Sequence, residues 1–200
     1  EAKTVSEDKY ISKRPTKGRG KRGEKATIEE EAAVPAESQI EPPLVYNVPE
    51  DPSLLKYIQD ALNNIMPIMN QREQVAALGK YVSDVFGGPI ERGQLMNFSW
   101  ELPLSQVKYT LKSNVVSIGL INFGIHIHRA LLFKFLADRI GVPVSLARGE
   151  YNRAWNEILL GDMSAKGRRY PPSLYIIDLI HDPGTLLKSD SIEANNYIKI

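Results

Sequence analysis

The apolar residues of this chain change their spacing at residues 141–143, from a helical period to an alternating one. Before this point the spacing predicts a helix over residues 125–140. Gly141 suits the left-handed position that ends a helix, and Pro143 prevents the helix from continuing. The apolar stripe of this helix consists of Leu131, Leu132, Phe135, Leu136 and Ile140.

After Pro143 the alternating pattern is typical of β-strands. It predicts strands over residues 144–149, 154–160 and 174–179. Upstream, Asp51 and Pro52 are suited to capping and starting a helix over residues 51–66. Further helices are predicted over residues 70–86 and 105–112, with an irregular segment at residues 90–104. Helices followed by an antiparallel sheet make an α+β fold.

Residues 1–42 have few large apolar side chains and carry their charges in separate blocks. A cluster of seven basic residues is followed by a run of glutamates. Such a composition cannot offset the entropy lost on ordering, so we predict a disordered tail or linker over residues 1–42 and a folded domain over residues 43–200. The basic cluster consists of Lys13, Arg14, Lys17, Arg19, Lys21, Arg22 and Lys25.

The sequence contains no cysteine, which excludes disulfide bonds, thiolate metal sites and a thiol nucleophile. Its longest apolar run, residues 115–127, is interrupted by polar residues and is too short to span a membrane. With no recognisable signal peptide at residue 1, the expected location is the cytoplasm. No cofactor is expected.

The run from Gly124 to Pro143 resembles the domain that precedes the kinase in plant Raf-like kinases of the ethylene-response and disease-resistance group. It resembles still more the same domain at the C-terminus of an animal armadillo-repeat protein. Residues 175–179 and 183–186 resemble the closing strand and turn of that family. The resemblance implies a transglutaminase/papain-like fold. In that fold a Cys heads the central helix, a His lies on the next strand and an Asp lies on the third.

Read one at a time, the three catalytic positions implied by the resemblance hold His126, Arg153 and Asp178. An arginine stays protonated near neutral pH and cannot act as a base. A neutral histidine is a poor replacement for an attacking thiolate. The resemblance therefore implies a degenerate triad and no cysteine-type catalysis, so we expect a domain that is not an enzyme.

The retained residues allow two interpretations. Asp178 and Arg153 are expected to form a charge pair on neighbouring strands. In the first interpretation the pair only holds the strands together, a contact that Arg129 could also supply. In the second, it forms a charged pocket that binds the backbone or terminus of a partner. Trp155 lies on an apolar strand, typical of a core residue. Trp100 lies in the irregular segment and is a candidate contact residue.

The only histidines are His126, His128 and His181, and the resemblance places all three near the degenerate triad. They are candidate metal ligands, although residues two apart on a helix face different sides, and we expect no metal. His128 is more readily explained by a hydrogen bond to a neighbouring segment.

The leading hypothesis is a non-catalytic protein-interaction domain of an armadillo-repeat scaffold, with a protein partner, no membrane contact, and a cilium or flagellum as a possible setting. One alternative is an enzyme of altered chemistry, a hydrolase using His126 or a metal. Another is binding of nucleic acid or of an acidic surface by the basic cluster. Nucleic acid is the less favoured of these, because the tail lacks aromatic residues between its basic ones.

Overall fold

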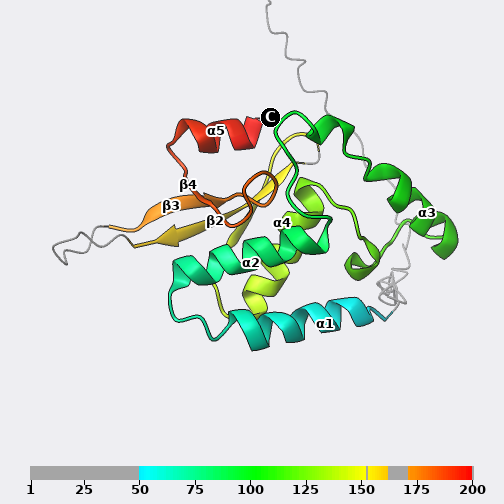
Figure 1. Cartoon of the computed structure of the whole chain (residues 1–200), viewed down its shortest axis with the longest axis horizontal. Coiled ribbons are helices and arrows are strands. Elements are labelled where there is room, and N and C mark those ends of the chain that lie inside the picture. The colour runs from blue at the N-terminus through cyan, green and yellow to red at the C-terminus, as the bar shows by residue number, and fades with distance from the viewer. Residues whose placement is uncertain (1–49, 152, 162–170, 200) are drawn as a thin grey trace, which may run out of the picture. The chain divides into compact units, whose positions relative to one another are not determined.

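All helices but the last precede the strands in the computed structural model, which describes residues 50–151, 153–161 and 171–199 (Figure 1). The chain divides into two units, residues 1–45 and 46–200, and every described residue belongs to the second. The predicted tail and its basic cluster lie outside the described residues. The α+β class is confirmed.

The first two helices begin at side chains that cap them. α1, Pro52–Asp60, follows Asp51, whose carboxylate accepts the Leu54 N–H at 2.9 Å, and it continues as a π-helical turn, Ala61–Ile65. α2, Gln71–Val85, follows Asn70, whose side chain accepts the N–H of Arg72. The helices predicted over residues 51–66 and 70–86 are therefore confirmed.

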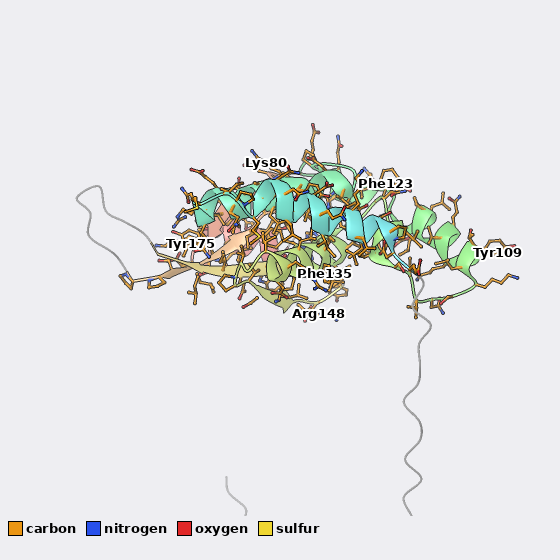
Figure 2. The ribbon with its side chains drawn as sticks, turned by 90° about the horizontal axis from the view of Figure 1, so that it is seen from below. Lys80, Tyr109, Phe123, Phe135, Arg148 and Tyr175 are labelled. Carbon is orange, nitrogen blue, oxygen red and sulfur yellow. The ribbon has the colours of Figure 1, made fainter. Side chains whose placement is uncertain are left out.

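Between α2 and the strands the chain forms two single 3₁₀ turns and two further helices. The turns are Leu95–Asn97 and Ile118–Leu120; the helices are α3, Glu101–Leu111, and α4, His126–Arg139. α3 starts at Glu101 rather than at residue 105 as predicted, so the segment predicted as irregular is shorter. No residue of α3 is fully buried, and Tyr109 on this helix is 84 % exposed (Figure 2).

The sheet is an antiparallel meander in the order β1-β2-β3-β4. β1 is Ser145–Arg148, β2 is Ala154–Leu160, β3 is Ser173–Ile177 and β4 is Leu186–Lys188. In the register of the sheet Ala147 pairs with Trp155, and Asn156 pairs with Ile177. The three predicted strands are confirmed, whereas β4 was not predicted.

Helices cover both faces of the sheet (Figure 1). α4 packs on β1 and β2, and α2 packs on α4 and β3; this side holds the larger core. The other face is covered by α5, Ile192–Lys199, which was not predicted either. A smaller core lies there, in which Ala194 and Tyr197 of α5 meet Ile176 and Ile180. Within the described residues, no helix is long and apolar enough to cross a membrane.

The predicted apolar stripe of α4 is only partly correct. Leu132, Leu136 and Ile140 are buried, but Leu131 is 37 % exposed and Arg129 is fully buried. The reason is that α4 lies between α2 and the sheet, which buries a wider arc than one stripe. As predicted, the helix ends at Gly141, which has a φ of 78°.

Candidate functional site

The three degenerate triad positions meet at one end of the sheet. His126 is the first residue of α4, Arg153 precedes β2 and Asp178 follows β3. Because β2 and β3 are antiparallel, the start of β2 and the end of β3 lie at the same end of the sheet. Tyr197 of α5 links the elements: its ring packs edge-on against His126, with centroids 6.0 Å apart, and its hydroxyl accepts the N–H of Leu179 at 3.1 Å.

His126 is a neutral, buried imidazole. Only 7 % of the residue is exposed, and its Nε2 has no hydrogen-bond partner. Burial, followed by the positive charge of Arg153 and then by His181 and Arg129, lowers the pKa of His126 to about 4. At neutral pH this residue therefore carries no charge.

Asp178 does not form the expected charge pair with Arg153 or Arg129. Its carboxylate is buried and accepts three backbone N–H groups that follow it. Oδ1 accepts from Ile180 at 2.7 Å and from His181 at 2.9 Å, and Oδ2 accepts from Asp182 at 3.1 Å. A carboxylate satisfied by neighbouring N–H groups holds a turn, in this case the turn between β3 and β4.

Arg153, left without Asp178, has a buried Nη1 with no hydrogen-bond partner. Asn156, three residues further along β2, is fully buried; its Nδ2 donates to the carbonyl of Ala130 at 3.2 Å, while its Oδ1 has no partner. Together with Nε2 of His126, these are the buried side-chain nitrogen and oxygen atoms without a hydrogen bond in the described part of the chain. Buried polar atoms are normally paired, so their concentration here is informative.

Arg129 is the largest fully buried side chain and was not predicted as a site residue. Burial lowers its pKa to about 10, which leaves it charged at neutral pH, and Tyr197, Asp178 and Asp84 act in the opposite direction. Its guanidinium group donates five hydrogen bonds that join the end of α2, the start of α4 and the segment after β3. The acceptors are Gly124 O at 2.8 Å, Ser83 Oγ at 2.8 Å, Leu179 O at 2.7 Å, Phe86 O at 3.2 Å and Gly88 O at 2.7 Å.

His126 and His181 lie close enough to interact, since His181 contributes to the lowered pKa of His126, whereas His128 has a separate contact. Nδ1 of His128 accepts the N–H of Ile125 at 3.3 Å, and its ring lies 5.4 Å from that of Trp100. This hydrogen bond is local to the start of α4 and does not join a neighbouring segment as expected. His181 contacts the carbonyl of Ile90 through Nδ1 at 2.8 Å. Among the described residues, no group of three His, Asp or Glu side chains is arranged to hold a metal ion.

The two tryptophans are both partly exposed. Trp155 is half-buried in the smaller core and donates from Nε1 to Glu157 at 2.8 Å. Trp100 is half-buried, and its ring lies 5.4 Å from that of His128. Neither has a partner that would distinguish a binding role from a packing role.

Residues 25–187 match the family described as EDR1/CTR1/ARMC3, peptidase-like. This chain belongs to that family. The match describes a peptidase-like domain, not a kinase. It begins inside the segment predicted as a tail, so the boundary at residues 42–43 stays a prediction. The resemblance seen in the sequence is confirmed at the level of the family.

Members of the EDR1/CTR1/ARMC3 family occur in animals and plants. The chain is 49 % identical over 152 residues to armadillo repeat-containing protein 3 of Homo sapiens, covering 74 % of this chain and 17 % of that protein. In Arabidopsis thaliana it is 35 % identical over 119 residues to the probable serine/threonine-protein kinase SIS8 and 34 % identical over 125 residues to the serine/threonine-protein kinase CTR1. Each of these matches covers 60 % of this chain, and they cover 11 % and 14 % of those kinases.

The chain thus spans less than a fifth of the length of these relatives. No solved structure gives a significant match.

Proposed function

We propose that residues 43–200 form a non-catalytic protein-interaction domain, a pseudoenzyme with a transglutaminase/papain-like fold that forms part of an armadillo-repeat scaffold. The observation that carries the proposal is the state of the three triad positions. The nucleophile position holds a neutral histidine, the base position holds an arginine, and the carboxylate of Asp178 is committed to backbone N–H groups. Covalent catalysis needs an activated nucleophile beside a base, and these residues supply neither.

The family supports the interaction role. The human relative is named for its armadillo repeats, and arrays of such repeats present extended surfaces to partners. In this proposal the domain adds a second contact. It is made at the end of the sheet where Nη1 of Arg153 has no hydrogen-bond partner. The partner is a protein, and we propose the cytoplasm, including cilia or flagella, as the place to seek it.

The test uses the full 200-residue chain to capture partners from a lysate of ciliated cells. Arg153→Glu should lose a defined protein that the wild-type chain captures, because the charge at the site is inverted. Arg148→Glu is the matched control: Arg148 lies at the end of β1, five residues before Arg153, and is exposed (Figure 2). Circular dichroism on both variants establishes that they are folded.

A third variant separates the tail from the domain. Replacing the seven basic residues of the tail by glutamine should leave capture unchanged if the domain carries the contact. Loss of capture in this variant, together with normal capture by Arg153→Glu, would instead assign the interaction to the tail and refute the proposal.

A further inference from the structure

Two of the three unpaired buried atoms of the described chain are side-chain nitrogens of residues close enough to interact, since the charge of Arg153 lowers the pKa of His126. They are Nε2 of His126 and Nη1 of Arg153, and the first belongs to a residue that is 93 % buried, since only 7 % is exposed. An unpaired donor in such a place costs about 1–3 kcal/mol. The third atom, Oδ1 of Asn156, is an acceptor one turn further along α4, beside Ala130, and takes no part in holding an anion.

The charges around these two nitrogens are unbalanced. Arg129 is positive, but all of its donors are used by neutral acceptors. Asp178 is the buried carboxylate nearby, and backbone N–H groups occupy it. Arg153 adds a second positive charge, and its Nη1 has no hydrogen-bond partner. Two guanidinium groups therefore face the one buried carboxylate of the described residues, that of Asp178, and Nε2 of His126 and Nη1 of Arg153 have no hydrogen-bond partner.

The N-terminus of α4 adds to this field. Ile125, at the N-cap position, has no side-chain acceptor, so the N–H groups of the first turn gain no cap from it. The partial positive charge of the helix N-terminus points towards His126, its first residue. A carboxylate is the anion whose planar oxygens match an arginine fork and an imidazole N–H together.

We propose that Arg153 and His126 bind a carboxylate group of a partner polypeptide at the N-terminus of α4. Nη1 of Arg153 donates to one oxygen, and Nε2 of His126, in the tautomer that carries its proton there, donates to the other. The group enters from the side of Arg153 and His181, which are partly exposed, whereas His126 and Tyr197 are buried. This inference rests on the proposed interaction function and names the chemistry that its site recognises.

The test is a titration of the full ¹⁵N-labelled chain with small probes, followed by NMR. Acetate should saturably shift the Arg153 Nε–H signal and the backbone amides of residues 126–128. Two further probes distinguish a chain-terminal carboxylate from a side-chain carboxylate of the partner. N-acetylalanine has a free terminal carboxylate and N-acetylglutamate α-amide has a side-chain carboxylate, and the one that binds more tightly indicates the source. N-acetylalanine amide, which has no carboxylate, should shift none of these signals.

Variants assign the contacts. Arg153→Met should weaken acetate binding about tenfold or more, since one hydrogen bond to a charged group is lost. Arg148→Met, the exposed control, should bind as the wild type does. His126→Phe should weaken binding, and His126→Gln, which keeps an N–H donor, should restore part of it. Chemical-shift comparison without probe shows whether each variant is folded.

Two results would overturn the carboxylate site. One is the absence of a saturable shift at residues 126–128 with any carboxylate probe. The other is equal binding by Arg153→Met and wild type. If either occurs while Arg153→Glu still loses a captured protein, the interaction function stands and only the carboxylate chemistry is wrong. If probes bind but no partner depends on Arg153, the carboxylate site stands and the scaffold role of this edge is wrong.

Discussion

Replacing Arg129 by methionine should destabilise the domain severely. Methionine has an unbranched stem like that of arginine and no polar donor, so the change removes the guanidinium group and keeps an apolar side chain at the position. Five acceptors then lose their partner, among them the carbonyls of Leu179 and Gly88, to which the hydrogen bonds are 2.7 Å long.

The magnitude follows from opposing contributions. A buried acceptor left unpaired costs about 1–3 kcal/mol, so five acceptors set a gross loss of at least about 5 kcal/mol. Removing a buried charge recovers several kcal/mol of desolvation. The net loss should be about 3–5 kcal/mol, the range found when one partner of a buried charged contact is removed. Many domains have a total stability of about 5–15 kcal/mol, so this is a large fraction.

Urea unfolding of the full chain, followed by tryptophan fluorescence, measures the effect. Arg129→Lys should recover only part of the loss, because an ammonium group has three donors in place of five. Arg148→Met, at an exposed position, should change stability by less than about 0.5 kcal/mol. A free energy of unfolding for Arg129→Met within about 1 kcal/mol of wild type would refute the argument that these hydrogen bonds hold the segments together.

Three further predictions concern stability. Because the pKa of His126 is lowered to about 4 in the folded chain, the unfolded chain binds more protons between pH 6.5 and 4, and stability should fall as the pH is lowered through that range. The loss contributed by His126 should be on the order of 3 kcal/mol at most. Urea unfolding at pH 7 and at pH 4 measures it: the free energy of unfolding should fall less between these two pH values in His126→Gln than in the wild type. Gly184→Ala should cost more than Gly141→Ala: both have positive φ, but a Cβ at Gly184 would meet the backbone of Ala76, whereas Gly141 has open space and should lose only about 1–2 kcal/mol in thermal unfolding. Asp178→Asn should lower the free energy of unfolding by about 1–3 kcal/mol, since an amide cannot accept three N–H groups as the carboxylate does, and equal stability would show that the turn does not need the charge.

The sequence was sufficient for the parts of the fold that have local signals. Asp51, Asn70 and Gly141 mark helix ends by chemistry that acts within one turn, and the structure has helix ends at all three. α5 has a weaker signal of this kind: the hydroxyl of Ser191 accepts the N–H of Ala194 at 3.1 Å. The helix is only Ile192–Lys199, too short for its period to stand out from its neighbours.

The site was less predictable, because its contacts join residues distant in the sequence. The resemblance located His126, Arg153 and Asp178, but nothing local shows that Asp178 turns to the N–H groups that follow it rather than to an arginine. The burial of Arg129 had one signal. It is a charged residue three and four positions before Leu132 and Phe133, which are fully buried on the same helix. A polar residue on a buried helix face is more often a buried side chain with its hydrogen bonds satisfied than an exposed charge.

The contacts of Arg129 also bear on how quickly the domain is made and lost. Four of its five acceptors lie 41 to 50 residues away in the chain, whereas the meander pairs each strand with its neighbour in sequence. Contacts between distant residues form late in folding because closing long loops is slow. Substitution of Arg129 should therefore leave the folding rate nearly unchanged and accelerate unfolding, so that this one side chain sets the lifetime of the folded state.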